Sequence, residues 1–496
     1  MNLFTITERI AKKVVAATAE KEVERLLKQL LPGTPWAGRA HAVGGYVRDE
    51  VMGLESNDLD IVVDVNGGAE AMTKYLHGLF PEETSNAHQM GTYPIWEIVF
   101  KKDVVYEREL FQTAGAEIQF ADTMKEEFPD PTSRQRVVKP ATLEEDIARR
   151  DFATNMLLKD MTTGEIFDLT GISRHDIEKG ILRGHPSVPL DKMFSDDPLR
   201  LVRFVRFQVK YGWKVPMEVL RAVRRNAKRI EVVPAERIKD ELEKIMELGK
   251  TAQAVRIMKA TGLLQYILPE VQDMIGVQQP KQFHAEGDVF RHTLSVLKHA
   301  PPTIEGQLAA LLHDVGKPMT QEIVGEAIKF HGHADTGAEI AEAVLRRLKF
   351  PSDKIKSVVT IVRNHMRPYE LMKVDDKSIR RFVRDVGDET VEAIMDMAAA
   401  DELGSLPVRQ DVPLVRERVK KVMESPIPIK RQPVLNGKEI MSILGIGPED
   451  RARLPEIGVA GRFLLEVADD YAARGLELTK NQATEILKDQ VAKGQL

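Results

Sequence analysis

The sequence predicts an α+β protein, with a small mixed β-sheet head followed by an all-α neck, body and tail. Two observations favour this fold class. Apolar runs of strand length, such as Leu59 to Val65, lie in the first part of the chain. From about residue 142 onward, apolar residues recur at helical spacing between prolines. At 496 residues the chain is also too long for one compact core, so we expect several domains.

Composition excludes several classes of protein. The sequence contains neither a long apolar run nor a signal-peptide core, so we expect no membrane partner and a cytoplasmic location. It contains no cysteine, which excludes disulfides and zinc–thiolate sites. The formal net charge of −5 means that any RNA site must be a local basic patch. No pattern indicates the oligomeric state.

The head region is predicted to combine a helix, several strands and a loop. The helix is expected at residues 6–31, where Pro32-Gly33 ends it. Residues 113–141 are polar, acidic and contain proline, which predicts a long, mobile loop. The strands are expected at 41–43, 59–65, 93–100 and 104–111.

Two glycines, Gly44 and Gly45, follow the first expected strand and open an expected helix. Glycines let the backbone approach a triphosphate closely, and a helix N-terminus offers free N–H groups. Arg48, one turn later, could reach the same phosphates. By itself the Gly-Gly pair more often marks a plain tight turn.

Two acids, Asp58 and Asp60, open the next strand. Alternation places both carboxylates on one face of the strand, where they could share Mg²⁺ ions with substrate phosphates. Two such ions, about 3.5–4 Å apart, can activate an attacking hydroxyl and stabilise a leaving pyrophosphate. The alternative is a pair of solvated acids at a strand entrance. We expect a third carboxylate, and Glu107 on a later strand is our candidate.

Taken in order, five motifs resemble the tRNA nucleotidyltransferase and poly(A) polymerase family, specifically the class II CCA-adding type. The resemblance covers roughly residues 38–490. The motifs are Gly44–Asp49 with Asn57–Val63, Glu145–Met156, Phe167–Gly171 with Asp176 and Ile177, Asp196–Phe207, and Glu236–Glu241.

The resemblance implies roles for residues of the head and neck. Gly45 and Arg48 would touch the incoming nucleotide, and Arg150 and Asp151 would bind its phosphates and ribose. Asp197 and Arg200 would read the base edge, supported by Arg203 and Arg206. The spacing of 197, 200 and 203 predicts one helix face. There an acid could accept from an exocyclic amine while arginine donates, which suits C or A. A solvated helix start with an internal salt bridge is the alternative.

Two positions depart from the family pattern. Asp196 stands where the family usually has glutamate, although it could still cap a helix. Gln112 follows Phe111 where the family usually has arginine. The length of the 113–141 loop leaves its part in switching from C to A open.

A set of histidines and acids later in the chain resembles an HD phosphohydrolase domain. Neutral imidazoles and carboxylates suit a divalent metal, whereas a lone histidine would more often be a core residue. Lys317 could meet a phosphate. Many CCA-adding enzymes carry such a domain, although a degenerate, tRNA-supporting domain is the alternative. The expected ligands are His292, His313, Asp314, His331, His333, His365 and Asp401.

Two groups of basic residues could contact RNA phosphates, although such runs are as often solvated faces. The tail around Asn436–Lys438 resembles the family's segment for the tRNA elbow. The first group is Arg221, Arg224, Arg225, Lys228 and Arg229, and the second is Arg416, Arg418, Lys420, Lys421, Lys430 and Arg431.

These patterns together predict a Mg²⁺-dependent enzyme that adds CCA to tRNA 3′ ends from CTP and ATP and releases pyrophosphate. The resemblance also implies an accessory phosphohydrolase activity with a second divalent metal. The alternatives are a CC-adding, A-adding or poly(A) relative, or an HD phosphohydrolase whose head binds nucleotide or RNA. The expected domains are 1–36 (N-terminal helical extension), 37–170 (nucleotidyltransferase head), 171–275 (neck with the base-selecting helix), 276–410 (HD domain) and 411–496 (tRNA-binding tail).

Overall fold

The computed structural model describes residues 19–91, 93–127, 137–280, 282, 284–285, 287–325, 327–408, 411–425, 434–447, 449–474 and 476–495. The chain divides into two compact units. The first comprises the described residues up to Ile245 with Gln253–Ile267, and the second comprises Met246–Ala252 and the described residues from Leu268 onward. Among these described residues, no helix is long and apolar enough to cross a bilayer.

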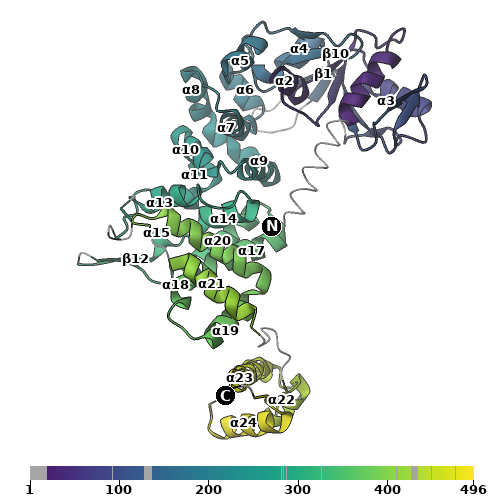
Figure 1. The fold of residues 1–496 in the computed structure, drawn as a ribbon. Helices are drawn as coiled ribbons and strands as arrows, with labels where there is room; N and C mark the ends of the chain where they lie inside the picture. Colours follow the sequence, from purple (N-terminus) through teal and green to yellow (C-terminus); the bar gives the residue numbers. More distant parts are fainter. Residues whose placement is uncertain are drawn as a thin grey trace. The chain divides into compact units, whose positions relative to one another are not determined.

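A seven-stranded sheet forms the centre of the head, in the order β11-β10-β1-β2-β7-β4-β3 (Figure 1). Strands β2 and β7 run parallel, and the other neighbours run antiparallel. The predicted α+β class with a mixed sheet is therefore confirmed. The strands are β1 (Ala40–Val43), β2 (Asp60–Val63), β3 (His88–Gln89), β4 (Ile95–Val99), β7 (Glu117–Asp122), β10 (Leu157–Asp160) and β11 (Ile166–Asp168).

The two faces of this sheet bury different cores, because successive side chains of a strand point to opposite faces. Ile61 and Val63 of β2 belong to a large core, whereas Val62 packs in a smaller one. Asp60 therefore shares its face with the smaller core. The head helices are α2 (Gly45–Val51), α3 (Gly68–Leu79), α4 (Leu143–Ala148), η1 (Ala153–Asn155) and α5 (Ser173–Lys179).

The expected N-terminal helix is present at residues 19–30, whereas residues 6–18 lie outside the described part of the chain. Val23, Leu26, Leu27 and Leu30 recur at helical spacing and are all buried in the large core of the head. This helix is therefore part of the head and packs beneath its sheet.

The prediction of a loop over residues 113–141 is wrong for the residues that the structure describes. Glu117–Asp122 forms β7, and β8 (Met124–Glu127) pairs with β9 (Val137–Pro140). Ile118 and Phe120 are buried and alternate with polar residues, so the polar composition concealed a half-buried strand. Residues 128–136 of the expected loop lie outside the described residues.

The single strand expected at 104–111 is a hairpin. Strands β5 (Val104–Tyr106) and β6 (Glu109–Phe111) pair around Glu107 and Arg108. Both turn residues have positive φ, 48° and 68°, which is the geometry of a tight hairpin turn. Sequence alternation continues through such a turn, and so it did not reveal the break.

From α6 onward, the residues that the structure describes form helices joined by loops, together with one β-hairpin (Figure 1). The neck contains α6 (Leu190–Asp196), α7 (Arg200–Tyr211), α8 (Met217–Asn226), η2 (Ala227–Val232), α9 (Ala235–Glu247), α10 (Thr251–Thr261), α11 (Leu264–Ile267) and α12 (Pro269–Gln272). The body contains α13 (Val289–Val296), α14 (Ile304–Leu312), α15 (Lys317–Thr320), β12 (Gln321–Val324), β13 (Ala327–Phe330), α16 (His333–Arg347), α17 (Ser352–Asn364), α18 (Arg367–Leu371), α19 (Asp376–Val386), α20 (Asp388–Gly404) and α21 (Asp411–Met423). The tail contains α22 (Gly437–Leu444), η3 (Arg451–Arg453), α23 (Leu454–Ala473) and α24 (Lys480–Ala492), and it has a core of its own.

Candidate active site and metal centre

A cavity of about 770 Å³ opens between the head sheet and the first neck helices. The head and neck residues expected at a nucleotide site all line it, with the exception of Glu107. They are Gly44, Gly45, Arg48, Asp58, Asp60, Arg150, Asp151, Asp197, Arg200, Arg203 and Arg206. Sequence reasoning missed Glu126, Arg149, Lys210, Arg237 and Lys244, which line the same cavity.

The Gly-Gly pair forms the turn from β1 into α2. Gly44 has φ of 74°, a conformation that side chains other than glycine rarely adopt. A Cβ on Gly45 would lie 3.4 Å from Nη2 of Arg48. Both glycines therefore keep the backbone open beside the arginine. Arg48 is itself fixed by an ion pair with Asp49 at 2.7 Å and by the ring of Tyr211, 4.9 Å from its guanidinium carbon.

The two acids expected to bind metal lie at the entrance of β2. Asp60 is the first residue of the strand, between Val43 of β1 and Gln119 of β7. Burial, followed by the nearby Asp58 carboxylate, raises the pKa of Asp60 to about 7, and Arg150 opposes this rise. Two close carboxylates in a cavity that is also lined by arginines and lysines suit a divalent cation together with an anionic ligand.

Glu107 does not complete this pair, which corrects the expected third carboxylate. It lies exposed in the β5–β6 turn and does not line the cavity. An acid that interacts electrostatically with Asp58 and Asp60 is Glu20, whose pKa is raised to about 8 by burial and then by these two carboxylates. Glu20 is on the N-terminal helix, about forty residues from the motif, so no local pattern could have identified it.

Asp151 joins the head to the neck within the cavity. Its carboxylate pairs with Arg203 of α7 at 2.6 Å and accepts hydrogen bonds from Asn155 and the Phe152 amide, both at 2.8 Å. Burial opposes ionisation, but Arg203 and these donors hold the pKa of Asp151 well below its usual range. Glu241 of α9 lies 3.7 Å from Arg203 and continues the network.

Replacing Asp151 with alanine is expected to lower the free energy of unfolding of the first unit by about 3 kcal/mol, because the partly buried Arg203 loses its closest carboxylate. The loss is largest above about pH 4 and shrinks at lower pH, since the folded-state pKa of Asp151 lies below its unfolded value. Trp36, Trp96 and Trp213 all lie in this unit, so tryptophan fluorescence during urea unfolding measures it.

The matched control is Asp191→Ala, which removes an exposed pair with Arg225. Solvent screens that pair, so we expect little change in the unfolding midpoint. An equal loss of unfolding free energy in the two variants would show that the Asp151–Arg203 pair stabilises the first unit no more than an exposed pair does.

The expected helix face of Asp197, Arg200 and Arg203 is only partly correct. Asp197 has extended backbone and lies between α6 and α7, so it is not on the helix that begins at Arg200. Asp196 is the last residue of α6 and pairs with Lys192 at 2.8 Å, so it does not cap α7. The proline that follows Asp197 explains the break, because it disfavours helical backbone in the residue before it.

Arg200 connects this break to the head. Its guanidinium donates to the backbone oxygens of Met193, at 2.9 Å, and of Arg149. The Arg149 guanidinium contacts Asp146 at 2.7 Å and Glu126 of β8 at 3.3 Å. Strand β8, which lies in the segment predicted to be a loop, is therefore linked through Arg149 to Arg200, the candidate for reading the base.

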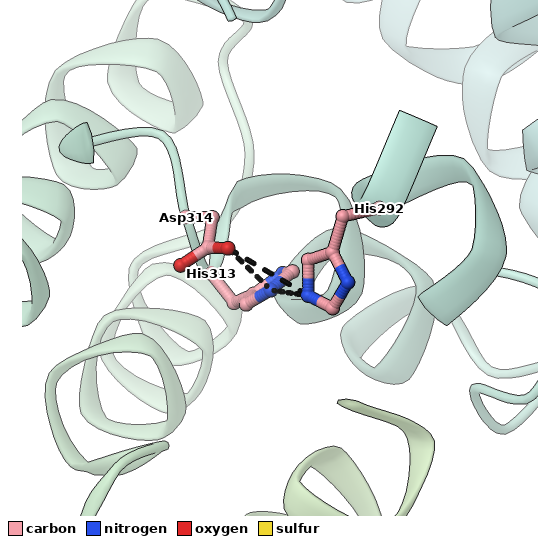
Figure 2. Close-up of side chains that lie close together, drawn as sticks. All are labelled: His292, His313 and Asp314. Atoms are coloured by element: carbon pink, nitrogen blue, oxygen red, sulfur yellow. Dashed lines mark hydrogen bonds and ion pairs between the residues drawn. The ribbon is translucent and has the colours of Figure 1, made fainter. Parts of the chain in front are cut away.

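The second unit contains a buried cluster of histidines and acids (Figure 2). Six of the seven expected ligands meet there. They come from α13 (His292), the end of α14 (His313, Asp314), the start of α16 (His333), the end of α17 (His365) and α20 (Asp401). Two groups have ligand atoms close enough to hold an ion, and they share one residue: His292, His313 and Asp314, and Asp314, His333 and His365.

The histidine rings are oriented for ligation. Nδ1 of His313, His333 and His365 lies 2.9, 2.8 and 2.6 Å from a backbone oxygen. Because a carbonyl only accepts, Nδ1 carries a proton in each of these rings, and the other ring nitrogen, Nε2, faces the cluster. Burial lowers the pKa of His365 to about 3, which keeps that ring neutral.

The acids of the cluster are ionised. Burial opposes the charge on Asp314, but His313 and Lys317 hold its pKa below the usual range. Lys317 lies 2.6 Å from Asp314 and donates to Gln279 at 2.6 Å, so it belongs to the cluster itself. An anionic carboxylate between neutral imidazoles has the chemistry of a divalent-metal site.

His331 is not part of this cluster, which corrects the expected ligand set. It is exposed in the turn between β13 and α16. His333 begins α16 and points inward, and the left-handed Gly332 between the two turns the chain. The two histidines therefore do not share a face.

Most of the basic side chains that we considered for RNA binding form ion pairs with nearby acids or donate hydrogen bonds to backbone oxygens. Arg225 pairs with Asp191, and Arg224 and Arg229 donate to backbone oxygens. In the second group, Arg416, Arg418 and Lys421 each pair with an acid. Lys430 and Arg431 lie outside the described residues.

Comparison with known proteins gives consistent matches along the chain. Three family models match: "Poly A polymerase head domain" at residues 40–183, "Probable RNA and SrmB- binding site of polymerase A" at 212–275, and "HD domain" at 289–404. A CC-adding tRNA nucleotidyltransferase of Thermus thermophilus is 32% identical over 90% of this chain and 93% of its own length. An A-adding tRNA nucleotidyltransferase of Deinococcus radiodurans is 29% identical over 88% and 92%, respectively.

The fold also resembles a solved structure. A crystal structure of the Bacillus stearothermophilus CCA-adding enzyme in complex with CTP covers 92% of this chain and 99% of that chain. The TM-score is 0.57 and the identity is 20%, so this likeness concerns the fold.

Proposed function

The chain belongs to the tRNA nucleotidyltransferase and poly(A) polymerase family, and we propose that its head adds C, C and A to tRNA 3′ ends from CTP and ATP. One observation carries the proposal. Asp58 and Asp60, the Gly44–Gly45 turn and the arginines of α7 line a single cavity, although they come from distant parts of the sequence. The cavity therefore combines a candidate cation site with a binding surface for an anionic nucleotide.

In this proposal the terminal ribose hydroxyl of the tRNA attacks the α-phosphate, and pyrophosphate leaves. Asp58 and Asp60 hold Mg²⁺, which would polarise the phosphate and stabilise the leaving group. Arg48 and Arg150 bind the phosphates as fixed donors, and the Gly44–Gly45 backbone leaves room for them. Both substrates and the tRNA are cytoplasmic molecules, which suits a cytoplasmic location.

Base selection is assigned to Asp197 and Arg200. A carboxylate can accept from the amino group that both C and A carry, and arginine can donate to the ring edge. Both residues line the cavity, and Arg200 is held by backbone oxygens of α6 and of the head. This anchoring favours a fixed, protein-supplied edge for reading the base.

The names of two relatives also support a narrower product, which is addition of CC alone or of A alone. The relative with 32% identity is named for CC addition, and the one with 29% is named for A addition. A chain similar to both could add CC alone or A alone.

The second unit supports an accessory role. The shared Asp314 and the inward Nε2 atoms suit a divalent-metal phosphohydrolase centre. In that case hydrolysis of a phosphate ester would accompany nucleotidyl transfer. The alternative is an HD phosphohydrolase whose head only binds nucleotide. In that case the head would incorporate no nucleotide into tRNA.

One incubation series tests these products together. tRNAs that end at the discriminator base, after one C, or after two Cs are each given labelled CTP or ATP with Mg²⁺. We expect CTP to extend the first two and ATP to extend only the third. CTP incorporation without ATP incorporation would indicate a CC-adding enzyme, and the reverse an A-adding enzyme. Long A tails would indicate a poly(A) polymerase, and no incorporation would refute the proposal.

A further inference from the structure

Three ion pairs join helix α19 of the body to helix α23 of the tail, and both helices belong to the second compact unit. In each pair the cation comes from α19 and the acid from α23. We call the three cations the α19 basic face and the three acids the α23 acidic face. The pairs are Lys377–Asp470 at 2.8 Å, Arg381–Glu466 at 3.2 Å and Arg384–Asp469 at 3.0 Å.

The spacing of these residues places each set on one side of its helix. The cations stand at positions 377, 381 and 384, and the acids at 466, 469 and 470, which are helical intervals of three, four and seven. Another side of α19 is apolar, since Ile379, Phe382 and Val383 are buried and the helix packs against α20 and α21. The α19 basic face is therefore a separate surface of the same helix.

The contact between α19 and α23 can open without disrupting the apolar core of the tail. That core and the apolar residues packed against it all come from residue 434 onward. The pair of Arg381 and Glu466 is open to solvent, with side chains that are 50% and 38% exposed. Exposed ion pairs stabilise a contact only weakly, and salt screens them. The two helices are thus joined by contacts that another polyanion could replace.

The origin of its acids distinguishes the α19 basic face from other basic side chains of the body. Arg416 pairs with Asp396 and Arg418 pairs with Asp376, and both acids belong to the body itself. The acids of the α19 basic face come from the tail instead. If α23 moves away, three cations on successive helical turns lose these acids together. Such a row of cations suits the phosphates of an RNA strand, which cations bind without reading the sequence.

We propose that the α19 basic face is a binding surface for the RNA phosphodiester backbone, which the α23 acidic face occupies when no RNA is bound. Binding of tRNA then displaces α23 from α19, because the tail acids and the RNA phosphates compete for the same cations. The proposal rests on tRNA being the substrate of the proposed nucleotidyl transfer. It concerns a surface away from the reaction, since none of the six residues lines the cavity of the head.

Neutralising each side of the contact separately distinguishes an RNA surface from a mere anchor for the tail. One variant combines Lys377→Gln with Arg381→Gln, and the other combines Glu466→Gln with Asp470→Asn. Each loses two of the three pairs, so both should release the tail. Affinity is measured over a range of NaCl concentrations by filter binding of a tRNA that ends at the discriminator base.

The two variants should change the affinity for tRNA in opposite directions. The variant without the acids should bind about fivefold more tightly, because the tail no longer competes. The variant without the cations should bind about tenfold more weakly, and the slope of log affinity against log salt should fall by about two. A change in the same direction in both variants would overturn the proposal.

Movement of the tail is measured directly by energy transfer between two dyes. The chain contains no cysteine, so Lys356→Cys in the body and Lys488→Cys in the tail, both exposed, provide two unique labelling positions. We expect efficient transfer in the wild-type background at low salt. Transfer should fall when tRNA is added and should be low in both neutralised variants without tRNA. Transfer that stays unchanged on addition of saturating tRNA would contradict the proposed competition.

The matched control is an exposed ion pair within helix α16, between Arg346 and Glu342 at 2.7 Å. Arg346→Gln and Glu342→Gln remove a cation and an acid without touching the contact between α19 and α23. Each should keep the affinity for tRNA within about twofold. Changes as large as those of the α19 and α23 variants would reduce the effect to net charge and overturn the proposal. A wild-type chain that binds no tRNA at all would instead refute the proposed function, and this surface with it.

Discussion

Replacing Asp58 or Asp60 with asparagine is expected to reduce nucleotide incorporation at least about 1,000-fold, which corresponds to about 4 kcal/mol of transition-state stabilisation. Asparagine keeps the shape of the side chain but not the charge that would hold Mg²⁺. Both acids line the cavity, so the change removes the expected cation ligands and little else. The measurement is the single-turnover rate of CTP incorporation into tRNA at saturating Mg²⁺.

Stability should move in the opposite direction in the Asp60 variant. Burial and the Asp58 charge raise the pKa of Asp60 to about 7. A carboxylate with a raised folded-state pKa costs stability once the pH exceeds its unfolded value, so at pH 8 the neutral asparagine should raise Tm. Loss of activity with an unchanged or higher Tm distinguishes catalysis from folding.

Asp64→Asn is the matched control for this experiment. Asp64 directly follows β2 on the same face as Asp60, but its carboxylate lies 3.6 Å from Arg39 and does not line the cavity. We expect near-normal incorporation from this variant. Incorporation at a wild-type rate by Asp58→Asn and Asp60→Asn would show that the reaction centre lies elsewhere.

Much of the head could be predicted because its motifs lie close in sequence to the strands that position them. The glycines and Asp58–Asp60 each lie next to the strand that presents them, and short-range alternation fixes the face of a strand. The strand predicted at 59–65 is present as β2, but its apolar residues are buried on both faces, so it is not half-buried. Its neighbour β7 was missed because Glu117, Gln119 and Asp122 made a buried strand look like a loop.

The remaining errors concern positions where the chain turns. Glu107 and His331 each continue an alternating or repeated pattern, but a turn intervenes and places both side chains in solvent. Asp197 was assigned to a helix that begins three residues later. Glu20 could not be identified from the sequence as a neighbour of the site, because its electrostatic interaction with Asp60 exists only after the N-terminal helix has packed against the sheet.

Removal of the shared acid of the histidine cluster is expected to abolish metal binding by the second unit. Asp314 belongs to both ligand groups, so we expect the second unit to hold two equivalents of divalent metal in the wild-type chain and none in Asp314→Asn, with any metal at Asp58 and Asp60 of the head counted separately. His292→Ala disrupts only the first group and His365→Ala only the second, so each should keep one equivalent. Bound metal is measured by mass spectrometry after dialysis against Mn²⁺ and removal of free ions.

His331→Ala provides the control that distinguishes this geometry from the sequence pattern. Sequence order groups His331 with the ligands, whereas the structure places it in an exposed turn, so this variant should keep both equivalents. The chain should remain folded in all four variants, as judged by circular dichroism, because the cluster's helices are held by separate apolar contacts such as Val296, Leu311 and Ile361. A single equivalent in the wild type would mean that Asp314 serves one ion and that the two groups compete for it. Loss of metal in His331→Ala would restore the expected seven-residue ligand set and require the β13–α16 turn to fold inward.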